Sequence, residues 1–94
     1  MKVGYARVSS MDQNLDRQLR EIRKAGAEKI FQEKLSGKSM NSQVELQQAL
    51  QFLREKDVLV IESLDRLGRN YAEIVQIVQK LDRKKIGLQI LNMP

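Results

Sequence analysis

The sequence predicts an α/β fold, a mostly parallel sheet of four to five strands flanked by helices. Strand-like and helix-like segments alternate along the whole chain in the order β-α-β-α-β-α-β, which is typical of such sheets. Residues 58–61 read Val-Leu-Val-Ile, a continuous apolar run of the kind found in strands buried on both faces. The 94 residues contain no repeat, low-complexity tract or Pro- or Gly-rich linker, so residues 1–94 are expected to form one domain.

The first strand is expected over residues 2–8, which are rich in β-branched and aromatic side chains. A helix follows, with a capping-box pattern of Ser10 and Gln13 at its start and Gly26 after its end. Its apolar residues recur at helical spacing, at Leu15, Leu19 and Ile22. The second strand is expected over residues 29–35, before a polar loop.

The second half of the chain continues the alternation. An amphipathic helix is expected from Leu46 to Leu53, ending before Asp57. The apolar run that follows it predicts a central strand. A third helix is expected over residues 71–81 and a fourth strand over residues 86–91.

Composition narrows the chemistry that this chain can perform. Cysteine, histidine, tryptophan and threonine are absent, which excludes disulfides, Cys or His nucleophiles and nearly every zinc or iron site. Catalysis must therefore use Ser, Tyr, Asp, Glu, Lys, Arg or Gln. No apolar run approaches a membrane span and no signal-like block opens the chain, so a soluble, cytoplasmic protein without membrane contact is expected.

The charge balance indicates a polyanionic partner. Lys and Arg number 17 against 12 Asp and Glu, which gives a net charge of +5 and a pI near 9.7. The terminal thirds of the sequence carry the positive excess and the middle third is slightly acidic. Charge alone leaves two alternatives open. The chain binds nucleic acid, or it is a basic protein that binds none.

Hydroxyls and arginines follow the predicted strands. In parallel sheets ligands bind beyond the carboxyl ends of the strands, here residues 7–10, 35–38 and 61–66. Arg7 and Ser9 are two residues apart, so both side chains lie on the same side of an extended chain, an arrangement suited to phosphate chemistry. The alternative is that Arg7 lies on a solvated strand face and Ser9 ends the strand or helps to cap the helix.

The segment from Asp65 to Arg69 precedes the third helix. Arg66 and Arg69 there oppose the helix dipole, which favours acidic groups in a first turn. An oxyanion held between the helix and both guanidinium groups, with Asp65 orienting one of them or relaying a proton, would compensate for this placement. The alternative is two solvent-facing arginines with Asp65 as a helix cap.

Two further groups of polar residues lie near the predicted strand ends. The amides of Gln13 and Gln18, near the start of the first helix, are suited to contact a phosphate or orient Ser9, although surface Gln is usually only solvated. The loop that contains Ser36 and Lys38 lacks the full phosphate-loop spacing, so a nucleoside-triphosphatase is rejected.

Two ordered motifs resemble a known family. The sequence Tyr-Ala-Arg-Val-Ser at residues 5–9, followed some 55 residues later by Leu-Asp-Arg-Leu-Gly-Arg at residues 64–69, resembles the catalytic domain of the small serine recombinases, the resolvase/invertase family. Asp12-Gln13, Gln18 and Ser36-Gly37 match between them, so the resemblance covers the whole chain.

The resemblance implies a mechanism. Ser9 would attack a scissile DNA phosphodiester, expel a 3′-hydroxyl and hold the 5′ end as a phosphoserine, without cofactor or metal. Arginine side chains would neutralise the phosphate, Asp65 would support them or take part in proton transfer, and other polar residues would be secondary. The implied catalytic residues are Ser9, Arg7, Arg66, Arg69, Asp65, Gln13 and Gln18, and the implied phosphate- or DNA-binding residues are Ser36, Lys38 and Gln43.

The sequence departs from the family pattern in two ways. Gln43 and Val44 occupy the place of a usual Arg-Pro pair, and losing that guanidinium would cost about 3–4 kcal/mol, or roughly 10²–10³ in rate. Residues 1–94 also stop before the long assembly helix and the helix-turn-helix domain that the family carries.

Three functions therefore stay open. The first is a recombinase catalytic core that acts on double-stranded DNA, forming dimers and then tetramers in bacteria, phages, plasmids or transposons. The second is an impaired relative that serves as a DNA-associated assembly module, for which Gln43 is the discriminating feature. The third is a small-molecule or phosphate-binding module related by architecture alone.

Overall fold

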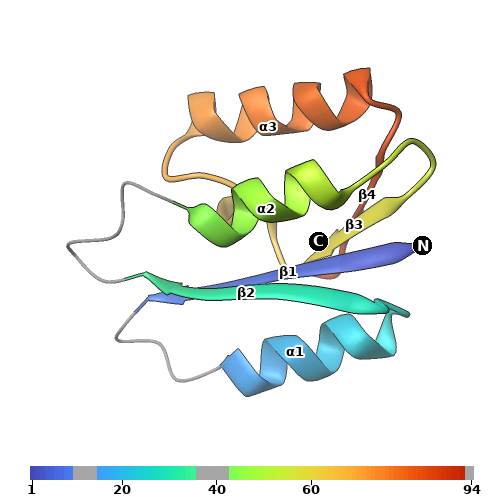
Figure 1. Cartoon of the computed structure of the whole chain (residues 1–94). Helices are drawn as coiled ribbons and strands as arrows, with labels where there is room; N and C mark the ends of the chain where they lie inside the picture. The colour runs from blue at the N-terminus through green and yellow to red at the C-terminus, as the bar shows by residue number, and fades with distance from the viewer. Residues whose placement is uncertain (10–14, 36–42, 93–94) are drawn as a thin grey trace.

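The computed structural model describes residues 1–9, 15–35 and 43–92. Its four strands form one parallel sheet in the order β2-β1-β3-β4 (Figure 1). The elements in chain order are β1 (Lys2–Ser9), α1 (Leu15–Lys24), β2 (Lys29–Leu35), α2 (Val44–Phe52), β3 (Val58–Ile61), the 3₁₀ helix η1 (Leu64–Arg66), α3 (Tyr71–Arg83) and β4 (Gly87–Ile90). The predicted α/β fold is confirmed, and the sheet formed by the described residues has four strands.

Helices cover both faces of the sheet. Figure 1 shows α2 and α3 on one face and α1 on the other. Alternate residues of the central strands face each layer: Tyr5 and Leu59 join the larger core beneath α2 and α3, while Ala6 and Val60 join the smaller core beneath α1. Because both faces are covered, β3 is apolar at all of its positions, and the buried residues of β1 on both faces are apolar.

Most predicted boundaries agree with the structure. The second and third strands have the predicted bounds, and the third lies inside the sheet as expected. The helix α2 begins two residues before its first apolar core residue, Leu46, and β4 is shorter than expected by one residue at each end. After α1, Gly26 has a φ of +103° and its N–H bonds to the carbonyl of Arg23, which confirms the predicted glycine stop. The capping box of Ser10 and Gln13 lies outside the described residues.

The parallel arrangement brings the carboxyl ends of all strands to one edge. Ser9 ends β1 and is in register with Leu35 at the end of β2. On the other side of β1, β3 ends at Ile61 and leads through Glu62 and Ser63 into η1. None of the helices in the described part of the chain is long and apolar enough to cross a lipid bilayer.

Candidate active site

Arg7 links the two sequence motifs in space. It lies two residues before the end of β1, is half-buried, and donates a hydrogen bond from Nη2 to the backbone carbonyl of Asp65 at 2.9 Å. These residues are 58 positions apart in the sequence. Arg7 is therefore not a freely solvated strand residue, and the end of β1 and η1 share one edge of the sheet.

Gln18 supports the end of β1 from beneath. Its side chain on α1 is fully buried, and its Nε2 donates to the backbone carbonyl of Arg7 at 3.1 Å. The interpretation of Gln18 as a solvated surface residue is wrong, because α1 packs this position against β1. The bond fixes the backbone from which the Arg7 side chain emerges.

The placement of the remaining predicted residues varies. The backbone of Ser9 closes β1 beside this cluster. Gln13, Ser36 and Lys38 lie outside the described residues. Asp65 is exposed within η1, and its carboxylate accepts a hydrogen bond from the hydroxyl of Ser63.

Asp65 does not cap the following helix. The N-cap of α3 is Asn70, whose side-chain oxygen accepts a hydrogen bond from the backbone N–H of Glu73 at 3.0 Å. The alternative of Asp65 as a cap is therefore wrong, because Asp65 lies within η1 and residues 66–70 separate it from α3. The Asp65 carboxylate accepts a hydrogen bond from Ser63 instead, and its backbone carbonyl accepts from Arg7.

Arg66 is only partly accessible. Its side chain is 19% exposed, and its Nη2 lies 3.8 Å from Oε2 of Glu62. Glu62 also accepts a hydrogen bond from Nη2 of Arg17 on α1 at 2.6 Å. Neither Glu62 nor Arg17 was predicted as a site residue, although an acidic residue directly after a buried strand is a signal for Glu62.

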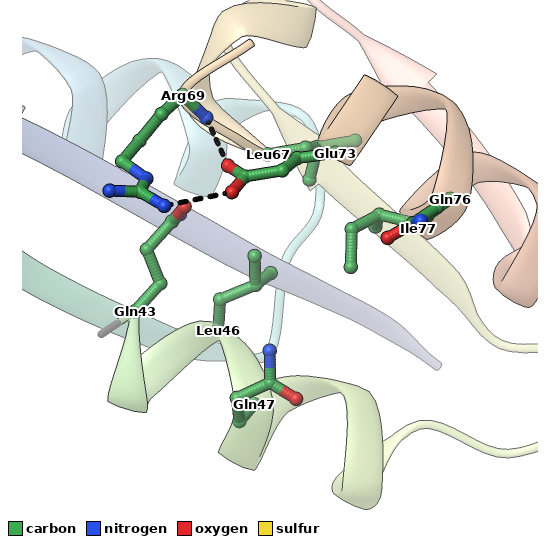
Figure 2. A pocket seen from close by; sticks show the side chains of 8 residues that line it. All are labelled: Gln43, Leu46, Gln47, Leu67, Arg69, Glu73, Gln76 and Ile77. Atoms are coloured by element: carbon green, nitrogen blue, oxygen red, sulfur yellow. Dashed lines mark hydrogen bonds and ion pairs between the residues drawn. The ribbon is translucent and has the colours of Figure 1, made fainter. Parts of the chain in front are cut away.

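Glu73 compensates for Arg69 at the start of α3. The backbone N–H and Nη2 of Arg69 donate to its two carboxylate oxygens at 2.8 and 3.0 Å (Figure 2). Hydrogen bonds from Arg69 hold the pKa of the Glu73 carboxyl below its usual range, and Arg7 lowers it further. Gly68 allows this approach, because a Cβ there would lie 2.8 Å from Cβ of Glu73. The i,i+4 spacing of Arg69 and Glu73 was the sequence signal for this pair.

Gln43 connects three elements through one amide. It is the N-cap residue of α2, and its Nε2 donates to the hydroxyl of Tyr5 at 2.9 Å and to the carbonyl of Arg66 at 3.0 Å. The hydroxyl of Tyr5 donates to Glu33 on β2. Both amide hydrogens of Gln43 are thus in use, so a contact between Gln43 and a phosphate requires one of these bonds to be given up.

Tyr5 is the buried centre of this network. Burial of its phenol, and then its bond to the Glu33 carboxylate, raise its pKa far above the usual value. Glu33 also accepts a bond of 3.4 Å from the backbone N–H of Glu45 in the first turn of α2. The network therefore fixes the start of α2 against β1 and η1.

A polar pocket of about 220 Å³ lies between α2 and α3. Figure 2 shows Gln43 and Arg69 toward one end of it and Gln76 and Ile77 toward the other. The lining residues are Gln43, Leu46, Gln47, Leu67, Arg69, Glu73, Gln76 and Ile77. Among residues 1–9, 15–35 and 43–92, no three acidic side chains come together as a metal site would require.

Comparison with known proteins decides the family. A family model described as "Resolvase, N terminal domain" matches residues 2–94, almost the whole chain. The chain belongs to this family. Among curated proteins, this resolvase-family domain is 40% identical over 91 residues to the transposon Tn501 resolvase of Pseudomonas aeruginosa, covering 97% of the chain and 47% of that protein.

Further relatives agree. The domain is 41% identical over 92 residues to the serine recombinase gin of Escherichia phage Mu, covering 98% of the chain and 47% of that protein. It therefore spans about half the length of these curated relatives. The fold matches the C-terminal catalytic domain of ISC1926 TnpA, an IS607-like serine recombinase, with a TM-score of 0.76 at 23% identity, covering 99% of this chain and 69% of that one.

Proposed function

We propose that this resolvase-family domain is the catalytic part of a site-specific DNA recombinase that cuts and rejoins double-stranded DNA through Ser9. The observation that carries the proposal is the hydrogen bond from Arg7 to the Asp65 carbonyl, which joins the end of β1 to η1. It supports one positively charged site built from both motifs. The relatives named as resolvases and as a serine recombinase support the class of reaction.

In the proposed reaction the Ser9 oxygen attacks the scissile phosphorus. A bond forms between this oxygen and phosphorus, and the bond from phosphorus to the 3′-oxygen breaks. In this proposal the Asp65 carboxylate takes part in proton transfer. The Ser9 hydroxyl gives up its proton to a base, and the departing 3′-oxygen takes up a proton. Attack by a 3′-hydroxyl on the phosphoserine reverses these steps and restores a DNA phosphodiester, so the bond energy is conserved.

The arginines supply charge stabilisation. Fixed guanidinium groups lower the energy of the additional negative charge that develops on a five-coordinate phosphate. The hydrogen bond to the Asp65 carbonyl holds Arg7. The ion pair with Glu62 holds Arg66, and the ion pair with Glu73 holds Arg69. In this proposal Gln18 keeps the Arg7 backbone in place, and Gln13, Ser36 and Lys38 contribute secondary contacts.

The wider protein is part of the proposal. We propose that the domain acts together with an assembly helix and a helix-turn-helix domain of the same protein, as dimers that form a tetramer on DNA. Support comes from the curated relatives, which are about twice as long as the matched region.

A second candidate is a DNA-associated assembly module with impaired catalysis. The observation that favours it is Gln43, which brings a neutral amide to the site and spends both of its N–H groups on Tyr5 and Arg66. The formation of a covalent adduct between protein and DNA separates this candidate from the first.

The test is the covalent adduct between protein and DNA. The chain, continued into the proposed assembly helix of its own protein, is fused to a zinc-finger array of known target, and the fusion is incubated with nicked duplexes whose sequence beside that target is randomised. The proposal predicts DNA attached to Ser9, located by mass spectrometry, and no adduct with Ser9→Ala. An adduct that survives Ser9→Ala refutes the nucleophile, and no adduct with the wild-type fusion favours the assembly module.

A further inference from the structure

Glu62 is a carboxylate placed at the base of the site. It follows the last residue of β3 and is only 8% exposed. Its backbone is fixed by the sheet, because the N–H of Asn92 bonds to the Glu62 carbonyl at 2.7 Å and that of Leu91 bonds to the carbonyl of Ile61 at 2.9 Å. An ionised group this buried is tolerated only beside opposite charge.

Two guanidinium groups provide that charge from different elements. Arg17 on α1 makes a hydrogen-bonded ion pair with Oε1 at 2.6 Å. Arg66 in η1 lies 3.8 Å from the other carboxylate oxygen, Oε2. Glu62 thus joins α1 to η1, and without its charge two like-charged arginines would share one region.

The contact between Glu62 and Arg66 is an ion pair without a hydrogen bond. Among the described residues, Oε2 of Glu62 and Nε of Arg66 are both buried and have no hydrogen-bond partner. The separation of 3.8 Å allows attraction but exceeds hydrogen-bond distance. The side chain of Arg66 is therefore held by charge, while its Nε–H is not spent on Glu62.

We propose that Glu62 is a positioning residue that holds the Arg66 guanidinium at the site by charge, without a hydrogen bond, so that the accessible part of the guanidinium can bind a phosphate oxygen. The consequence for DNA rests on the proposed function, in which Arg66 contacts the scissile phosphate. Glu62→Gln then has two effects of opposite sign. It removes a negative charge, which favours DNA binding, and it releases Arg66, which slows cleavage.

The hold on Arg66 is measured first, without any reaction. In NMR spectra of the 94-residue chain, the Arg66 Nε–Hε signal is assigned by its loss in Arg66→Lys. Glu62→Gln should shift this signal and speed its exchange with water. The matched control is Glu21→Gln, because Glu21 lines the same cleft of about 310 Å³ as Glu62, is exposed, and carries the same charge. An Arg66 signal unchanged by Glu62→Gln overturns the proposal.

The effect on reaction is measured next with the zinc-finger fusion. Glu62→Gln should slow formation of the Ser9 adduct by about 10- to 100-fold at saturating DNA, with equal or tighter DNA affinity, because small displacements of a positioned group carry such costs. Glu62→Asp keeps the charge and should recover part of the rate, and Glu21→Gln should leave it unchanged.

The outcomes separate the two proposals. A Glu62→Gln protein whose adduct rate rises together with its affinity shows simple charge repulsion and overturns the positioning role. If wild type forms no adduct, the proposed catalytic function fails, and the NMR comparison alone decides whether Glu62 holds Arg66.

Discussion

Replacing Gln43 with Met should lower the free energy of unfolding, although the two side chains are similar in length. Met keeps a similar length but cannot donate, so the bonds to the Tyr5 hydroxyl and to the Arg66 carbonyl are both lost. Tyr5 keeps its bond to Glu33, whereas the Arg66 carbonyl loses the Gln43 bond. At about 1 kcal/mol for each lost bond, the free energy of unfolding should fall by about 2 kcal/mol.

The assay is urea denaturation followed by circular dichroism. With a slope of about 2 kcal/mol per molar, the midpoint should move down by about 1 M. Gln47→Met is the matched control, because Gln47 lies one turn further along α2, lines the same pocket and is exposed. Its unfolding free energy should change by less than about 0.5 kcal/mol. Equal shifts of the urea midpoint for the two variants would show that the bonds from Gln43 to Tyr5 and Arg66 do not stabilise the fold.

Three further predictions follow from the same network and its neighbours. Because the pKa of Tyr5 is raised, stability should fall above about pH 10, where the unfolded chain releases a proton that the folded chain retains; Tyr5→Phe should remove this loss in urea titrations across pH 9–11 and Tyr71→Phe, at an exposed ring, should not. Glu73→Gln should tighten sulfate binding, measured by calorimetry, about two- to fivefold, because sulfate no longer competes with the Glu73 carboxylate for Arg69. An unchanged sulfate affinity would contradict this prediction. Gln43→Arg should raise the rate of adduct formation by about 10²-fold, because a guanidinium has enough N–H groups to keep both existing bonds and add a charge; equal rates would show that position 43 is not impaired.

The spacing of apolar residues was sufficient to predict β1 to β4 and α1 to α3, but not the short helix η1. The run at residues 58–61 is apolar at every position because helices cover both of its faces, so its bounds were predicted without error. Gly26 marked a helix end because only a residue tolerant of positive φ fits there. These are local properties, which a single sequence carries directly.

The polar contacts of the site were harder to predict. Tyr5 and its partner Gln43 are 38 positions apart in the sequence. Arg17 and its partner Glu62 are 45 positions apart. No local sequence pattern connects residues at such distances. The burial of Gln18 likewise depends on the packing of α1 on the sheet. Such residues have surface-like chemistry in the sequence and gain their role only from tertiary structure.

The central claim is that the ends of β1 and η1 build one phosphate site, and a bound anion tests it most directly. Crystals of the chain soaked in selenate would locate the anion by its anomalous scattering. One anion is expected within hydrogen-bond distance of the Ser9 hydroxyl and of the guanidinium groups of Arg7, Arg66 and Arg69. An anion bound elsewhere, with these four groups dispersed, would contradict the account.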